Sequence, residues 1–238
     1  MRKLHIPLMT GMVMANTPAF ALEVWGTTWA GSGEAGYVAT SGNTETSNLT
    51  LKLGLTNERE KWRHNLALEG LKSEDDGDTT AERYLAAWQS DYKLSEHDYL
   101  FGRLSYEDDK FSGYNYRITE SIGYGRRVLD RNNMTLDLEA GPGLRQSELD
   151  NGDKENEAIL RLAARYAWDI TDHAKFTEEL SSDIGEDATI TKSVTALQAD
   201  IVGNLAMKAS FTIKNTSDVP AGVEKTDTET ALTLVYGF

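Results

Sequence analysis

The sequence predicts an all-β protein, and more narrowly a transmembrane antiparallel up-and-down β-barrel of about 12 strands. From residue 34 to the last residue, segments of roughly ten residues alternate apolar and polar side chains and are separated by turn residues. The chain then ends on one of its most apolar segments. After the first 21 residues, no apolar run approaches the eighteen or so residues that a transmembrane helix needs, so only strands could cross a membrane.

The last segment, residues 230–238, is the clearest of the expected strands. Leu232, Leu234, Tyr236 and Phe238 share one face, because successive side chains of a strand point to opposite sides. Chain termini usually fray into water, whereas the last strand of a barrel pairs with the first. The pattern is similar to the C-terminal signal that the bacterial barrel-assembly machinery reads, so we expect that machinery as a partner during biogenesis. An ordinary buried edge strand is the alternative.

The first 21 residues have the features of a secretory signal peptide. Arg2 and Lys3 form a basic start, an apolar stretch follows, and Ala19-Phe20-Ala21 fits the small-x-small cleavage rule. We therefore expect export through the inner membrane with cleavage of residues 1–21. An irregular N-terminal lead-in over 22–32 and a single barrel domain over 33–238 are expected to follow.

Charge and cysteine content narrow the range of partners. The formal net charge of −14 becomes −16 once residues 1–21 are removed, because they carry two basic residues and no carboxylate. A protein this acidic is poorly suited to binding nucleic acid, so we expect no nucleic-acid partner, and no cofactor is predicted. Without cysteine, an exported chain must be held together by a large core or by a closed sheet.

Twelve segments with turn residues between them account for the rest of the chain. The expected strands cover residues 34–40, 49–56, 62–69, 83–92, 100–107, 114–125, 134–145, 157–169, 175–183, 191–201, 207–214 and 230–238. An even number of strands brings both ends of the chain to the same side of the membrane. The connections after the third, seventh and eleventh segments are longer or more polar than those after the even-numbered segments, as in bacterial barrels whose long loops face outward. We therefore expect outer-membrane lipids around the wall and both ends on the periplasmic side.

Three of these segments are less regular than the others. Segment 157–168 has a helix-forming composition, but Leu162 and Tyr166 fit only the period of a strand. Glu120 and Glu178 fall on the apolar faces of their segments, where a carboxylate facing lipid is costly. A β-bulge, or a position near the membrane interface, would remove that conflict.

Aromatic residues gather toward the ends of the expected strands. In a barrel they would form girdles at head-group depth, and in a soluble β-sandwich they would fill the core. The residues are Trp62, Tyr84, Tyr92, Tyr114, Tyr124, Trp168, Tyr236 and Phe238.

The polar face of nearly every segment carries charges of both signs, which in a barrel point into the lumen. The lumen of a barrel with about 12 strands is wider than that of an eight-stranded barrel, which side chains fill. It is narrower than the lumen of a general porin. These charges brace the wall or line a narrow path for ions or solutes. Their mixed signs show no selectivity ring, which favours bracing. The candidate lumen charges are Arg63, Glu69, Arg83, Asp91, Arg103, Arg117, Asp137, Glu139, Arg145, Arg161 and Arg165.

Several short stretches are similar to a known family. They are residues 36–46 (GYVATSGNTET), Tyr116-Arg117-Ile118 with Gly123-Tyr124-Gly125, Gly141-Pro142-Gly143 followed by Arg145, and the terminal Tyr-Gly-Phe. Together they resemble the family of salt-induced outer-membrane proteins, domain-of-unknown-function family 481, over roughly residues 33–238, with SGNTE at 41–45 the most specific. The resemblance implies an outer-membrane barrel of a Gram-negative bacterium with a link to salt or osmotic conditions, and it implies no catalytic residue.

Three functions fit these observations: a non-enzymatic barrel that is structural or a narrow channel, a membrane-embedded lipid-modifying enzyme, and a soluble periplasmic β-sandwich binding protein. Outer-membrane lipid hydrolysis needs a serine with a histidine base. His97 and His173 fall in expected periplasmic turns. His64 lies near the periplasmic start of its strand on the lipid-facing side, so no histidine is expected at the outer rim beside a serine. This favours a protein that is not an enzyme.

Two acidic clusters carry oxygen ligands of the kind that suit Ca²⁺, at residues 74–78 and 150–153. Neither continues into the spacing of a twelve-residue calcium loop with its final glutamate. We expect both clusters to be solvated loops, and no metal site is predicted. The sequence predicts no particular oligomeric state.

Overall fold

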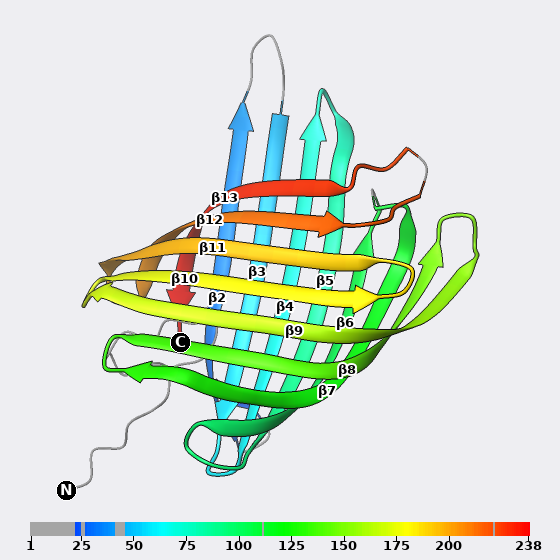
Figure 1. Ribbon diagram of the computed structural model, residues 1–238. Coiled ribbons are helices and arrows are strands. Elements are labelled where there is room, and N and C mark those ends of the chain that lie inside the picture. Colours follow the sequence, from blue (N-terminus) through cyan, green and yellow to red (C-terminus); the bar gives the residue numbers. More distant parts are fainter. Residues whose placement is uncertain (1–21, 25–26, 41–45, 111, 221) are drawn as a thin grey trace, which may run out of the picture.

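The computed structural model describes residues 22–24, 27–40, 46–110, 112–220 and 222–238. Twelve long antiparallel strands form one closed barrel, in which each strand pairs with its neighbours in the chain and the last strand pairs with the first (Figure 1). The strands are β2 (Thr27–Thr40), β3 (Thr46–Glu58), β4 (Trp62–Asp75), β5 (Asp78–Lys93), β6 (Asp98–Asp109), β7 (Tyr114–Arg131), β8 (Met134–Leu149), β9 (Lys154–Thr171), β10 (Ala174–Gly185), β11 (Thr189–Val202), β12 (Leu205–Thr216) and β13 (Thr226–Gly237).

The predicted fold class and the number of barrel strands are confirmed. Segment 157–168 lies within strand β9, so the period-two pattern outweighed its helix-forming composition, as predicted. Among the described residues, no helix is long and apolar enough to span a membrane. The expected signal peptide, residues 1–21, and the SGNTE stretch, residues 41–45, lie outside the described residues.

Two expectations about the ends of strands are wrong. The lead-in over residues 22–32 is not irregular: it contains the short strand β1 (Leu22–Val24) and the first part of β2, which pair with each other. Of the two acidic clusters expected to be loops, 150–153 is the connection between β8 and β9, whereas 74–78 is mostly strand, with a connection of two residues at 76–77. Polar strand ends keep their ladder partners beyond the apolar part of the wall, so the strands have 12 to 18 residues instead of about ten.

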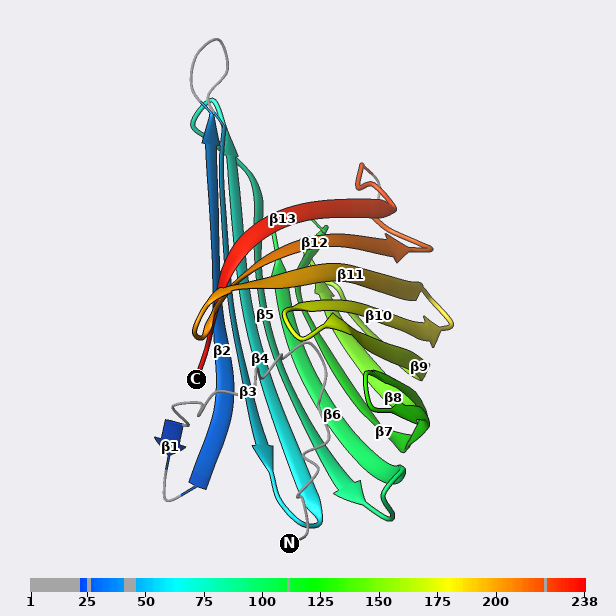
Figure 2. The ribbon, with the colours of Figure 1, turned by 90° about the vertical axis from the view of Figure 1, so that its left-hand side faces the viewer.

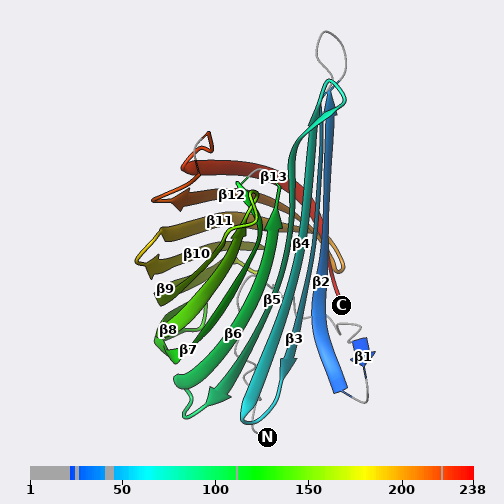
Figure 3. The same ribbon diagram turned by 90° about the vertical axis from the view of Figure 1, so that its right-hand side faces the viewer.

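The barrel has a turn end and a loop end. The connections 59–61, 94–97, 132–133, 172–173 and 203–204 lie at the turn end with the C-terminus, and the longest described connection, 217–225, lies at the loop end. In Figure 1, β2 to β5 stand nearly upright while β9 to β13 cross in front of them at a steep angle, and Figure 3 shows the two groups of strands from the side. This steep stagger decides which inward side chains meet across the barrel.

Closure depends on a short ladder between β13 and β2. It runs from Gly237 paired with Ser32 to Leu234 paired with Ala35, whereas the ladder between β2 and β3 extends from Ala30 to Thr40. Beyond this ladder β13 curves away from β2 (Figure 2). The closing contact is therefore concentrated at the last residues of the chain.

The outer wall follows the predicted alternation, with exposed leucines and aromatic residues on every side. Glu120 lies on this wall between Leu104 and Leu144, and no bulge interrupts the ladders there, so the suggested change of parity does not occur. Glu178 also faces outward, where its carboxylate accepts hydrogen bonds from the hydroxyls of Ser193 (2.7 Å) and Thr195 (2.5 Å). The neighbouring strand thus satisfies one of the two outward carboxylates.

On the inner face, glycines let β7 and β8 approach closely. A Cβ at Gly141 would overlap the carbonyl oxygen of Ile122 and the Cα of Gly123, which are backbone atoms that cannot swing aside. Replacing Gly141 with alanine is therefore expected to lower the free energy of unfolding by about 2 kcal/mol, the usual cost of overpacking. Unfolding in urea, followed by tryptophan fluorescence in detergent micelles, measures it.

The matched control is Gly102→Ala on the outer face of β6, where a Cβ would have no neighbour within 4 Å. This variant is expected to unfold at the same urea concentration as the parent protein, or slightly above it, because alanine restricts the unfolded chain. Equal midpoints for the two variants would contradict the close approach of β7 and β8.

Candidate functional site

The lumen is the candidate site, because charged side chains are buried inside it. Arg63, Asp91, Arg117, Asp137, Glu139, Arg145 and Arg161 are buried, and Glu69, Arg83, Arg103 and Arg165 are partly buried. All eleven lie on the inner face. A buried charge is costly unless it is paired and hydrogen-bonded, so the partner of each one decides what the lumen can do.

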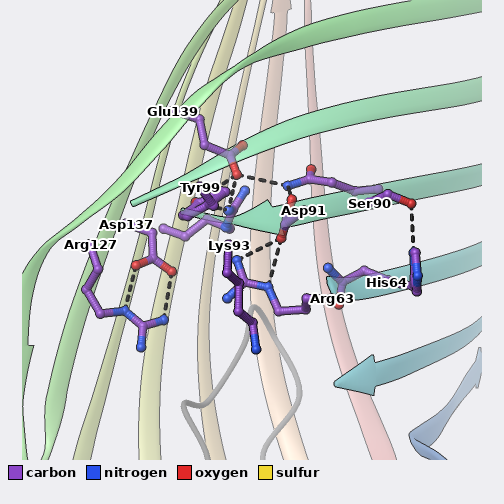
Figure 4. Close-up of polar contacts among 12 residues, drawn as sticks. Arg63, His64, Ser90, Asp91, Lys93, Tyr99, Arg127, Asp137 and Glu139 are labelled. Atoms are coloured by element: carbon purple, nitrogen blue, oxygen red, sulfur yellow. Dashed lines mark hydrogen bonds and ion pairs between the residues drawn. The ribbon is translucent and has the colours of Figure 1, made fainter. Parts of the chain in front are cut away.

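A layer of hydrogen-bonded side chains crosses the lumen near the turn end (Figure 4). This turn-end layer consists of Arg63, Gln89, Asp91, Tyr99, Glu139 and Arg165. The Gln89 amide donates to both Asp91 and Glu139, at 2.9 Å each, and the Tyr99 hydroxyl donates to Glu139 at 2.9 Å. Arg165 donates to Glu139 and, at 3.0 Å, to the Tyr99 hydroxyl. Glu139 is the common acceptor that joins β5, β6 and β9.

The other end of the turn-end layer is anchored on β4. The Arg63 guanidinium donates to the fully buried carboxylate of Asp91 at 2.8 Å and stacks over the ring of Tyr99. Beside the layer, Arg127 and Asp137 form a two-armed pair with distances of 2.8 and 3.0 Å. The layer therefore spans strands β4 to β9, which is five steps around a twelve-stranded ring.

A second set of ion pairs crosses the lumen nearer the loop end. These loop-end pairs are Arg83 with Glu229 at 2.7 Å, and Lys214 with Glu107. Lys214 lies on β12 and Glu107 on β6, which are six strands apart in either direction around the ring. Opposite walls of the barrel are thus in direct side-chain contact.

Two cavities lie on either side of the turn-end layer. A vestibule of about 1120 Å³ opens among the short turns and reaches Arg63 and Tyr99. A central chamber of about 260 Å³ lies on the other side and reaches Gln89 and Arg165. On β5, β6 and β12, the residues of the loop-end pairs follow the chamber-lining residues toward the loops. The central chamber therefore lies between the two sets of cross-lumen contacts.

The structure brings some of the candidate lumen charges together and leaves others separate. Arg63, Asp91, Glu139 and Arg165 belong to one layer. Three of the remaining contacts are local: Arg145 with Glu157, Arg161 with Asp183 at 2.8 Å, and Arg117 under the ring of Tyr114. Glu69 on β4 and Lys192 on β11 approach to 4.0 Å across the lumen, five strands apart around the ring. Within the described part of the chain, Arg103 has neither a hydrogen bond nor an ion pair.

Tyr99, Arg127 and Glu229 are contact-making residues that were missing from the sequence-based candidates. Tyr99 lies four residues from the inward candidate Arg103 and Arg127 lies ten residues from the inward candidate Arg117. Both separations are even, so strand parity alone could have placed the two residues in the lumen. The contact between Glu229 and Arg83 joins residues far apart in the chain, and no local pattern indicates it.

A histidine does lie beside a serine, on the outer wall near the turn end. His64 Nδ1 is 2.8 Å from the Ser90 hydroxyl oxygen, which also accepts a 2.8 Å hydrogen bond from the indole of Trp88 (Figure 4). Among the described residues, no carboxylate contacts the other ring nitrogen to orient it, as a catalytic triad requires. In the same part of the chain, no three His, Asp or Glu side chains converge on a metal site.

The residues of the expected assembly signal line the closing seam. Leu232, Leu234 and Tyr236 are exposed on the outer wall. Phe238 exchanges two backbone hydrogen bonds of 2.8 Å with Gly31, and its ring occupies the space that a Cβ at Gly31 would need. The last residue therefore extends the short ladder between β13 and β2.

Comparisons with known proteins agree with this architecture. The family described as "Protein of unknown function, DUF481" matches residues 33–238. The chain is 32% identical over 207 residues to the uncharacterized protein YdiY of Escherichia coli (strain K12), covering 87% of this chain and 82% of that protein.

Two solved structures share the fold. The NanC porin aligns with a TM-score of 0.54 at 10% identity, over 87% of this chain and 98% of the porin. The COG4313 outer membrane channel from Pseudomonas putida F1 aligns with a TM-score of 0.52 at 12% identity, over 95% of this chain and 100% of the channel. At such low identity the likeness shows the fold alone.

Proposed function

Because the chain belongs to the DUF481 family of proteins of unknown function, we propose its function from its own lumen: it is a non-enzymatic outer-membrane barrel of a Gram-negative bacterium whose lumen is a narrow, cross-braced channel. The observation that carries the proposal is the contact between opposite walls. Lys214 on β12 reaches Glu107 on β6, and the turn-end layer joins β4 to β9. A lumen crossed at two levels passes water and small ions and excludes larger solutes.

The outer-membrane location is supported by the wall itself. Its exposed face carries leucine, isoleucine and aromatic side chains all around the barrel, and the eleven candidate lumen charges point inward. Outside the part of the seam where β13 leaves β2, the backbone groups pair within the closed sheet, as a lipid environment requires. Barrels of the same fold include a porin and an outer membrane channel. The proposed partners are the surrounding lipids and, during biogenesis, the barrel-assembly machinery.

The contacts of His64 and Ser90 on the outer wall support the proposal that the protein is not an enzyme. The Ser90 hydroxyl is held by both His64 and Trp88. Throughout the described residues, nothing supplies the third, orienting group of a hydrolytic triad. Loss of lipid hydrolysis by purified protein on substituting Ser90 with alanine would contradict this view.

Single-channel recording of the refolded mature chain in a planar bilayer tests the channel. We expect discrete steps that are much smaller than those of a general porin recorded in the same bilayer, because side chains cross the lumen twice. Steps as large as the porin's would overturn the narrow lumen. A folded barrel with no steps at all would leave only the structural role.

A salt series in the same experiment addresses the proposed link to salt or osmotic conditions, which rests on the family resemblance. Salt screens ion pairs that water can reach, so the cross-lumen pairs are expected to loosen as the salt concentration rises. Conductance should then increase more steeply than the conductivity of the solution. A strictly proportional increase would remove this physical support.

A further inference from the structure

Arg103 is the starting point, because its guanidinium faces the central chamber without a partner. It lies on β6 between Gln89 on β5 and Ser121 on β7. Across the ladders described, its side chain makes no hydrogen bond and no ion pair, whereas the chamber-lining Arg161 and Arg165 are each paired with a carboxylate. The Arg103 charge interacts with those of Arg161 and Arg165 and also with the carboxylates of Glu139 and Asp183, which are the partners of those two arginines.

Further hydrogen-bond donors around Arg103 are also unused. The Nε of Arg161, the Nε of Arg165 and the hydroxyl of Ser121 are buried without a hydrogen-bond partner. Leaving a buried donor unsatisfied costs about 1–3 kcal/mol. Four polar groups on β6, β7 and β9 therefore lack acceptors in one region of the lumen.

The walls of the chamber carry more positive than negative charge. Its cationic side chains are Lys52, Arg103, Arg161, Arg165, Lys192 and Lys208, and its carboxylates are Glu34, Glu69 and Glu179. Two cations are matched inside the chamber, Lys208 by Glu34 at 2.9 Å and Lys192 by Glu69 at 4.0 Å. A volume of about 260 Å³ holds several water molecules or one small solute.

We propose that the central chamber binds a small oxyanion, a carboxylate or a phosphate, with the guanidinium of Arg103 as its main contact. Carboxylate and phosphate oxygens match the planar donor fork of arginine. Such an anion supplies acceptors for the guanidinium of Arg103 and for the Nε groups of Arg161 and Arg165, which have none among the described residues. The turn-end layer narrows the lumen on one side of the chamber, and the loop-end pairs narrow it on the other. This inference rests on the proposed channel and deepens it, because an anion site in the lumen selects which ions pass.

Isothermal titration calorimetry on the refolded mature chain in detergent tests the chamber. Inorganic phosphate and acetate are titrated separately, at constant ionic strength in a chloride buffer, so that the two arms distinguish phosphate from carboxylate. We expect at least one of them to bind. Replacing Arg103 with glutamine is expected to weaken that binding about tenfold or more, the usual value of a charge-assisted hydrogen bond.

Arg117→Gln is the matched control. Arg117 is another buried lumen arginine, but it lies under the ring of Tyr114 in a separate pocket at the loop end. This variant is expected to bind the anion as the parent chain does, and circular dichroism checks that both variants remain folded. Equal binding by Arg103→Gln and the parent chain, or no binding of either anion to the parent chain, would overturn the proposal.

Calorimetry does not require ion flow, so the two proposals can fail separately. Anion binding without single-channel steps would support the proposed anion site and overturn the proposed channel. Single-channel steps without anion binding would reject the chamber alone.

Discussion

Replacing Glu139 with glutamine is expected to cause the largest loss of stability of any single change in the lumen. Glu139 is 4% exposed and accepts hydrogen bonds from Gln89, Tyr99 and Arg165. Glutamine has the same shape but no charge, and its amide group presents donors to a cluster of donors. Removing one partner of a buried ion pair costs about 3–5 kcal/mol, because the other charge stays buried.

Two measurements test the effect of Glu139→Gln. Urea unfolding by tryptophan fluorescence gives the loss in the free energy of unfolding, and planar-bilayer recording reports on the turn-end layer. Arg165 and Gln89 lose their common acceptor, so the layer should loosen and the single-channel steps should become larger. A stable variant with unchanged steps would show that Glu139 does not hold the layer together.

Glu179→Gln is the matched control for Glu139. Glu179 is also an inward carboxylate that lines the central chamber, but it has no hydrogen bond or ion pair within the described sheet. Its replacement is expected to change the free energy of unfolding by less than about 0.5 kcal/mol. A loss as large as that of Glu139→Gln would mean that any inward carboxylate matters equally.

Deleting Phe238 is expected to weaken the closing seam by about 3 kcal/mol. The deletion removes two backbone hydrogen bonds to Gly31 and the ring that packs over it. Each hydrogen bond is worth about 1 kcal/mol, and the partly buried ring contributes about 1 kcal/mol more. Because the ladder between β13 and β2 is short, few other contacts compensate. In cells, a loss of this size should lower the amount of folded barrel several-fold.

Comparing folding in cells with refolding into lipid vesicles separates two roles of Phe238. A folding defect in both settings would show that Phe238 stabilises the closing seam. A folding defect in cells alone would show that Phe238 acts as part of the assembly signal. Phe238→Tyr keeps the ring and the backbone hydrogen bonds, so it should behave like the parent chain. Normal folding of the deletion variant in both settings would refute the importance of the last residue.

The alternation of side chains was enough to predict the barrel and its outer wall. Leu232, Leu234 and Tyr236 are exposed on one face of β13, as counting in twos predicted. Most of the inward charges follow from the same count. The limits of the strands did not follow, because polar strand ends such as 73–75 continue to pair beyond the apolar wall and resemble loops in composition.

Outward carboxylates show where a one-strand pattern is insufficient. Glu120 and Glu178 violate the alternation equally in sequence. In the structure, Ser193 and Thr195 on β11 satisfy Glu178, whereas Leu104 and Leu144 flank Glu120. The difference comes from neighbouring strands, whose register sets what each residue meets.

The sequence by itself therefore determined the fold class, the number of barrel strands and the alternation of inward and outward side chains, because the period of a strand is a local property of two residues. Only the tertiary structure decided that Lys214 meets Glu107 across the barrel, that Glu139 accepts hydrogen bonds from three donors and that Arg103 has no acceptor among the described residues. Those contacts depend on ring closure and on the stagger between strands, which accumulate over all twelve strands and leave no signature in any one of them.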